Sequence, residues 1–414
     1  MLFNRHKNKT IVRIVDQWKK SEKYYAPGVL IAVSNGQGLL REEQIDTQDS
    51  SHLILSLGDQ SLMQLQGDEY FCPTCEKILK SAYGLEQSKI FREQMQGLNH
   101  NEDFMELVNS MTPFWELLSD GCYILLDTKL YPTDGNGHLF WNVPNLDYTL
   151  PGTCIYYYGD CEWGNCRPHF TITTQPYRIL NPNRVEYYEK HPQGRALAYH
   201  MDGYMTALID GHHKAMAAAK THQMVDALVI IPCYTSWRSS DDGSLTTYLG
   251  NEEWLWNCNE YGIAPRETKI IKKESWNSEN ISALFISDVP EDAKPEMDQL
   301  AAYYPDVHGV ASIDLLGEIT NQRLDNIIRH QEIIAAERVT YFLKALVSLK
   351  HYRIIELFDF FLHENAYDLY KYAMIKEIVS LNADGKLTDY FIDVMVEFED
   401  DYPEIKDLIL DYIW

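Results

Sequence analysis

The sequence contains one short segment in which an apolar run, a glycine and an alanine-rich run follow each other without a spacer. The apolar run 204–209 leads to Asp210, Gly211 comes next, and residues 215–219 read Ala-Met-Ala-Ala-Ala. An apolar run that stops at a glycine before strong helix formers predicts a strand, a tight turn and the start of a helix. The segment therefore predicts an α/β arrangement in the middle of the chain.

Basic side chains occupy the predicted first turn of this helix, where His212, His213 and Lys214 follow Gly211. The start of a helix presents unpaired backbone N–H groups and the positive end of the helix dipole, so it attracts anions and disfavours cations. Cations in this turn become favourable when a phosphate or carboxylate binds there and offsets their charge. We therefore predict an anion-binding site formed by these three residues and Gly211. The alternative is a solvated Asp-Gly turn with an exposed histidine pair.

The segment Asp210-Gly211-His212-His213-Lys214 resembles the signature turn of the ParB/sulfiredoxin-like superfamily, in which a strand ends in Asp-Gly-His-His-Arg or a variant before a helix. The flanks are similar as well, because residues 179–184 resemble the strand and Asn-Pro start of such domains and 227–232 resemble the next core strand. The similarity covers roughly residues 172–236. It implies a turn that binds nucleotide phosphates or related anions, in a superfamily that includes nucleotide switches, nucleases, a serine kinase and sulfinic acid reductases.

This chain departs from the family pattern within the turn, and these departures reduce the number of activities that the resemblance implies. The reductases carry a reactive cysteine where this chain has His212, and the DNA-partitioning members carry two arginines where it has His213 and Lys214. The Asp-Gly-His-His form is most similar to the kinase-like members, in which an upstream glutamate acts on the substrate hydroxyl. Glu186 and Glu189 are the upstream candidates, with solvated acids on an exposed helix as the alternative.

These observations favour a phosphate- or nucleotide-binding protein that could act as a phosphotransferase. In this interpretation Asp210 holds Mg²⁺ or orients a hydroxyl, His213 is a donor that titrates near neutral pH, Glu186 is the upstream catalytic residue that acts on the substrate hydroxyl, and Lys214 supplies charge. One alternative is a non-catalytic interaction scaffold or ligand-gated switch. A second is a nuclease.

The net charge bears on these alternatives. The formal charge is −25 and the sequence pI is about 4.9, so most of the surface repels nucleic acid, which argues against general nucleic-acid binding and weakens the nuclease alternative.

No apolar stretch is as long as a membrane span, and the basic N-terminus lacks the apolar region of a secretory signal. We therefore expect a cytoplasmic protein that does not enter a membrane.

Two cysteine pairs are candidates for a structural zinc site. Cys72 and Cys75 form a CxxC that contains a proline, and Cys161 and Cys166 form a second pair. Four thiolates can hold one tetrahedral Zn²⁺ in a closed site. The alternatives are a redox-active CxxC and unrelated buried thiols.

The whole pattern predicts a mixed α+β fold with an all-α C-terminal domain. We expect an N-terminal α+β region over 1–171 with the zinc knuckle, a ParB/sulfiredoxin-like domain and its extension over 172–294, and helices over 295–414. The last region has amphipathic faces such as Ile354, Leu357, Phe358 and Phe361, and its helices resemble either HEAT-like repeats or a bundle. Eight acidic residues against one lysine between 393 and 411 form either a solvated face or a docking surface for a basic protein partner.

Overall fold

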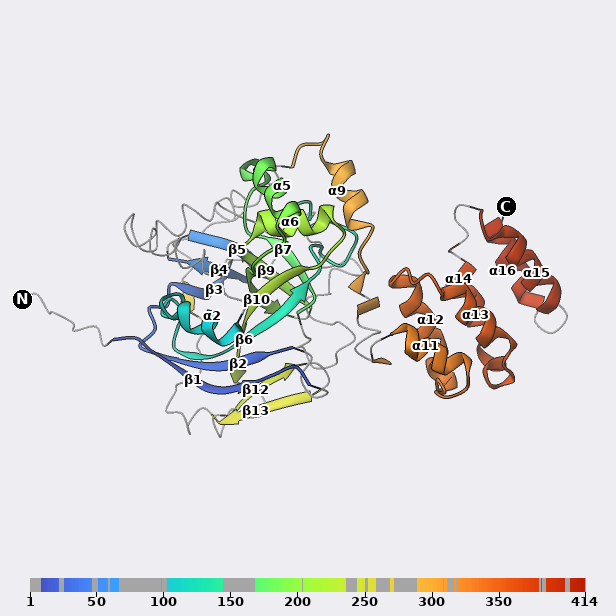
Figure 1. The fold of residues 1–414 in the computed structure, drawn as a ribbon, viewed down its shortest axis with the longest axis horizontal. Helices are drawn as coiled ribbons and strands as arrows, with labels where there is room; N and C mark the ends of the chain where they lie inside the picture. Colours follow the sequence, from blue (N-terminus) through green and yellow to red (C-terminus); the bar gives the residue numbers. More distant parts are fainter. Residues whose placement is uncertain are drawn as a thin grey trace, which may run out of the picture. The chain divides into compact units, whose positions relative to one another are not determined.

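The computed structural model divides the chain into two compact units, Met1–Tyr304 and Pro305–Trp414, and each is considered by itself (Figure 1). The structure describes residues 9–21, 26–46, 51–58, 60–66, 98, 103–143, 168–202, 204–235, 244–249, 252–257, 269–271, 289–307, 309–310, 316–317, 319–379, 381, 385–398 and 403–413. The first unit combines strands and helices and the second is helical, which confirms the predicted α+β class and the all-α C-terminal part.

A seven-stranded mixed sheet organises the first unit, in the order β1-β2-β6-β10-β8-β9-β7. Its strands are β1 (Ile11–Trp18), β2 (Gly28–Ser34), β6 (Gly121–Leu130), β7 (Phe170–Thr173), β8 (Ala196–Asp202), β9 (Met205–Asp210) and β10 (Val225–Pro232). The pairs β10/β8 and β9/β7 are parallel and the other neighbours are antiparallel. The central strand β10 is buried almost throughout, as its run of valine, leucine and isoleucine predicts.

Two smaller sheets accompany the large one. The first has the order β14-β3-β4-β5 and the second the order β11-β12-β13. Their strands are β3 (Leu40–Asp46), β4 (Ser51–Leu57), β5 (Gln60–Gln66), β11 (Tyr234–Thr235), β12 (Ser244–Leu249), β13 (Glu252–Asn257) and β14 (Lys269–Ile271). The parallel pairing of β14 with β3 joins segments that lie more than two hundred residues apart in the chain.

Helices α5 (Pro182–Lys190), α6 (His212–Lys220) and α9 (Lys294–Ala301) lie on one side of the large sheet (Figure 1). The alanine-rich face of α6 packs onto the sheet, because small side chains allow a helix to approach closely. One buried cluster joins α6 and α9 to the strands, and it includes Ala215, Ala219, Met297, Ala301, Ile124, Leu126, Ala198, Ala227 and Val229. The short helices α2 (Phe104–Ser110) and α3 (Thr112–Trp115) precede β6.

The predicted domain boundaries are wrong in two places. The regions 1–171 and 172–294 are not separate domains, because β2 and β6 from the first lie in the same sheet as β8 and β10 from the second. The helical unit begins at Pro305 rather than at 295, because α9 packs into the core of the first unit. Sequence periodicity detects α9 as a helix but cannot tell which core buries it.

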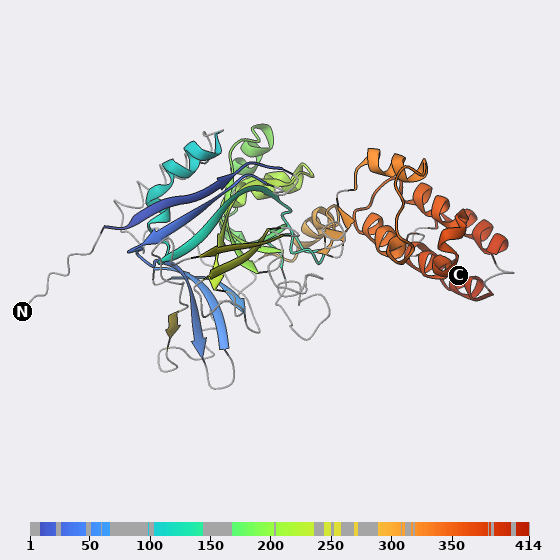
Figure 2. The same ribbon diagram turned by 90° about the horizontal axis from the view of Figure 1, so that it is seen from below.

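The helical unit contains six α-helices within the described ranges (Figure 2). They are α11 (Asn321–Ile328), α12 (Val339–Ser348), α13 (Ile354–His363), α14 (Lys371–Val379), α15 (Thr388–Phe398) and α16 (Pro403–Ile413), and the 3₁₀ turns Ala336–Arg338 and Asn365–Tyr370 precede α12 and α14. The predicted face of α13 is confirmed, since Leu357, Phe358 and Phe361 are fully buried. None of the helices that the structure describes in either unit has the length and apolar character needed to cross a membrane.

Candidate functional site

The predicted strand, turn and helix are present at residues 205–220. Strand β9 ends at Asp210, Gly211 has a φ of +99°, and α6 begins at His212. A Cβ atom at position 211 would lie 2.6 Å from the Ala196 Cβ and 2.8 Å from the Ala196 Cα. The glycine is therefore required by its backbone conformation and by its close approach to β8, which is a packing reason that the sequence does not reveal.

Backbone donors are concentrated at the start of α6. The first helical hydrogen bond runs from the Ala215 N–H to the Gly211 carbonyl, over 2.9 Å. The N–H groups of His212, His213 and Lys214 have no acceptor among the described residues. No side chain caps this helix end, so these donors and the helix dipole form a local site of positive potential.

His212 carries a further donor in its ring. The side chain is buried, and its Nε2 accepts a hydrogen bond from the Thr174 N–H over 3.2 Å. Burial and the neighbouring His213 hold the pKa of His212 well below its usual value, so the ring is neutral and its one hydrogen lies on Nδ1. This Nδ1 has no partner in the described part of the chain, and neither does the buried Nε1 of Trp141, whose ring centroid lies 5.5 Å from that of His212. The two neighbouring rings thus both offer buried donors that lack an acceptor.

His213 joins the starts of α5 and α6. Its Nε2 accepts a hydrogen bond from the Asn181 N–H over 3.0 Å, while the Asn181 side chain caps α5. Burial and the nearby Arg184 guanidinium lower the pKa of His213 to about 4. The ring is therefore neutral at pH 7, which corrects the expectation that His213 is a donor titrating near neutral pH. The imidazole acts as an acceptor that holds two helix starts together.

Acidification is expected to destabilise the first unit through this histidine. The folded-state pKa of about 4 lies below the ordinary 6.5, so the unfolded chain binds a proton that the folded chain does not. The contribution to stability is complete above the ordinary pKa and is lost as the pH falls from 6.5 towards about 4. Urea denaturation between about pH 7 and pH 5 should show a falling free energy of unfolding, and a shallower fall for His213→Gln. Equal slopes for the two proteins would contradict this role.

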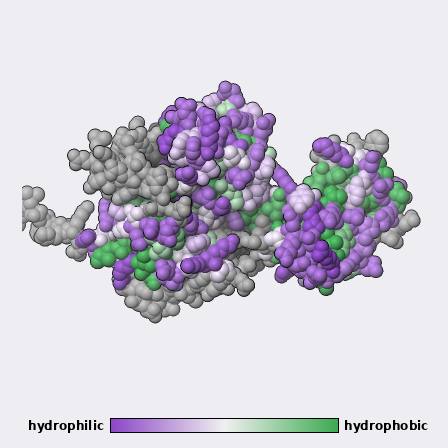
Figure 3. Space-filling view, viewed as in Figure 1, coloured by the Kyte–Doolittle hydropathy of each residue, from purple (hydrophilic) through white to green (hydrophobic). Residues whose placement is uncertain are grey.

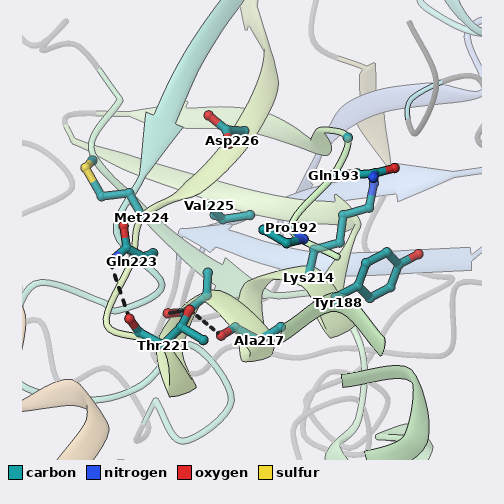
Figure 4. Close-up of a pocket in the computed structure, with 12 residues that line it drawn as sticks. Tyr188, Pro192, Gln193, Lys214, Ala217, Thr221, Gln223, Met224, Val225 and Asp226 are labelled. Carbon is teal, nitrogen blue, oxygen red and sulfur yellow. Dashed lines mark hydrogen bonds between the residues drawn. The ribbon is translucent and has the colours of Figure 1, made fainter. Parts of the chain in front are cut away.

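Lys214 is buried, although its sequence context predicts an exposed cation. Only 8% of the residue is accessible, and its Nζ donates a hydrogen bond of 2.5 Å to the Arg195 carbonyl. Burial lowers the pKa of Lys214 to about 8, against the raising effect of the Asp210 carboxylate. The amine lies over the Tyr188 ring at 5.8 Å from the centroid. The side chain is thus directed toward the start of β8 and lines a cavity with Tyr188 and Pro192 (Figure 4).

Two charged residues complete the surroundings of the turn. Asp210 is half-buried, and its carboxylate is close enough to raise the pKa of both His213 and Lys214. Arg184 is exposed on α5, and its guanidinium is close enough to lower the same two pKa values. Sequence reasoning missed Arg184, although its place three residues after the capping Asn181 was a usable signal because it puts the residue in the first turn of α5.

Glu186 does not join this group in the described contacts. It is exposed on α5 and forms an ion pair with Lys190, at 2.5 Å between the Nζ and an Oε, and this pairing lowers its pKa. Of the three predicted catalytic residues, the structure brings Asp210 and His213 together. Glu186 has the features of a solvated helix acid, the alternative that its sequence context also allowed.

The four predicted zinc ligands, Cys72, Cys75, Cys161 and Cys166, lie outside the described residues, so the site stays a prediction that metal analysis of the purified protein can test. Within the described ranges, no cluster of three or more histidine, cysteine or acidic side chains could hold a metal. Cys122 and Cys233 are buried in the core, as their apolar neighbours predict.

Comparison of the chain with family models, with curated proteins and with solved structures finds no match in any of the three. The function therefore has to be inferred from the geometry and chemistry of the turn itself.

Proposed function

We propose that the turn at the start of α6 binds a phosphate-bearing small molecule such as a nucleotide. The observation that carries this proposal is the concentration of unpartnered donors in one helical turn. Three backbone N–H groups, those of His212, His213 and Lys214, have no acceptor in the described chain, and the ring of His212 adds a fourth donor without one. Phosphate oxygens are acceptors that suit such a turn, because the helix dipole favours their charge.

Charge supports an anion as the ligand. Arg184 supplies an exposed guanidinium near the turn, whereas Lys214 contributes its backbone N–H and places its side-chain amine on the Arg195 carbonyl. The protein carries a formal charge of −25, so a local positive site contrasts with its surroundings and selects anions. Guanidinium groups bind phosphate through parallel hydrogen bonds, which a lysine cannot provide.

A phosphotransferase is the catalytic form of this proposal. Asp210 would hold Mg²⁺ against the phosphates, since hard cations prefer carboxylate oxygens. Phosphoryl transfer depends mostly on positioning and charge neutralisation, so a small set of groups can support it. Because Glu186 is paired with Lys190, the group that accepts the substrate proton would come from another residue or from the substrate.

Calorimetric titration of the full chain with ATP, ADP and CTP, with and without Mg²⁺, tests the proposal. Arg184→Ala should weaken binding about 10- to 150-fold, because a charge-assisted hydrogen bond contributes about 1.5–3 kcal/mol. Thermal stability should change little, since the side chain is exposed. Arg329→Ala is the matched control, because it removes an exposed arginine from the helical unit.

Two results would contradict the proposal. The wild type could bind none of the three nucleotides, or Arg184→Ala could bind them as tightly as the wild type does. An interaction scaffold would then be the better assignment. It has support of its own, because the helical unit exposes large apolar side chains, including Ile333, Tyr352 and Leu369 at 80%, 78% and 95%. Figure 3 shows hydrophobic areas on the surface of this unit.

A further inference from the structure

Lys214 has an amine that the proposed anion site does not use. Its Nζ donates to the Arg195 carbonyl, and no carboxylate in the described chain forms an ion pair with it. The nearby Arg195 guanidinium is itself taken by the Asp127 carboxylate, with N···O distances of 2.6 and 2.8 Å. The Asp210 carboxylate favours the charged form of this lysine, but burial is the larger effect and Arg184 and Arg195 act with it, so the uncharged amine is favoured.

This amine borders a small cavity. The cavity has a volume of about 70 Å³, and one wall is a face of α6 that carries Lys214, Ala217, Ala218 and Thr221. The opposite wall comes from residues 192–194 and from the start of β10, with Tyr188 beside the lysine (Figure 4). About 10–15 Å³ of such volume holds one water molecule, so the cavity can accept a molecule of a few heavy atoms.

The lining defines the chemistry of the occupant. Ala217, Ala218, Met224 and Val225 make much of the wall apolar, and the charged residues in it are one base, Lys214, and one acid, Asp226. A ligand with its own carboxylate or phosphate would find no second cation among these residues. The cavity therefore suits a small, neutral molecule that reacts with an amine.

We propose that Lys214 condenses with a short neutral aldehyde in this cavity to form an imine. The Nζ lone pair attacks the carbonyl carbon and forms a carbinolamine. The two amine hydrogens then leave with the former carbonyl oxygen as one water molecule, and a C=N bond remains. No oxidant or reductant is needed. This activity is separate from the proposed binding of phosphate at the helix start and does not depend on it.

Burial makes the reactive form of the amine accessible at neutral pH. With its pKa lowered to about 8, roughly one Lys214 amine in ten is uncharged at about pH 7, whereas an exposed lysine with its ordinary pKa is almost entirely protonated. Lys220 is a suitable internal comparison, because it lies on the same helix, is 38% exposed in its side chain and pairs with Glu296.

Reductive trapping of the full chain tests the proposal. The folded protein is incubated with acetaldehyde and cyanoborohydride at about pH 7, and alkylation of each lysine is followed by peptide mass spectrometry. Lys214 should be alkylated at least about 10-fold faster than Lys220, because roughly one Lys214 amine in ten is uncharged at about pH 7.

Two variants make the result decisive. Lys214→Arg should remove the fast alkylation while the other lysines react as before. Ala218→Leu should fill the cavity and slow alkylation of Lys214, with an unchanged circular dichroism spectrum as the check on folding. The proposal is overturned if Lys214 reacts no faster than Lys220 in the wild type, if it reacts only after denaturation, or if a folded Ala218→Leu protein reacts at the wild-type rate.

Discussion

Replacing Gly211 with alanine is expected to lower the free energy of unfolding of the first unit by about 2–5 kcal/mol. The φ of +99° costs an L residue about 1–2 kcal/mol, and the new Cβ must also displace Ala196, whose Cβ lies 2.6 Å away. Forcing a methyl group into a packed position costs about 1–3 kcal/mol more. Nucleotide binding should fall as well, because the turn that aligns the N–H groups is distorted.

Gly137→Ala is the matched control for this prediction. Gly137 also has a positive φ, +91°, but a Cβ built there meets nothing within 4 Å. Gly137→Ala should therefore lower the free energy of unfolding only by the conformational cost of the positive φ, about 1–2 kcal/mol. Urea denaturation of both variants measures the difference between their losses in free energy of unfolding. This difference is the energetic cost of the close approach between the turn and β8. Equal losses in the two variants would show that this contact relaxes without cost.

Phe361→Ala is expected to destabilise the helical unit by about 3–5 kcal/mol. Phe361 is fully buried, and its ring lies 6.0, 5.4 and 5.1 Å from those of Phe342, Phe360 and Tyr367. Truncation leaves a cavity among these rings, so the lost contacts add to the lost burial. Thermal or urea unfolding of the full chain should show an early transition of the helical unit.

Leu369→Ala is the control, and it should change stability by less than about 0.5 kcal/mol. Helical spacing places Leu369 on an apolar face with Ile375 and Val379, but the structure leaves it 95% exposed. It lies in the 3₁₀ turn Asn365–Tyr370 before α14, where the turn rotates it away from the buried face. A large loss of stability in Leu369→Ala would mean that this surface is covered in solution.

Local sequence signals identified the elements that carry the candidate site. The apolar run before Asp210, the glycine and the alanine-rich run predict β9, the turn and α6, because these preferences act between neighbours in the chain. The buried face of α13 is also predicted by a local pattern, because the helical spacing of Leu357, Phe358 and Phe361 is sufficient to identify it.

Only the tertiary structure decided what the side chains of the turn do. His213 and Lys214 have basic side chains in the sequence, but α5 and β8 bury them against the Asn181 N–H and the Arg195 carbonyl, and burial removes or weakens their charge. The same packing brings Arg184 to the turn. Solvent exposure and distant partners are set by how helices and strands assemble, and no local pattern encodes them. The sequence determines by itself that a helix begins here, whereas the packing of its neighbours determines which of its groups can meet a ligand.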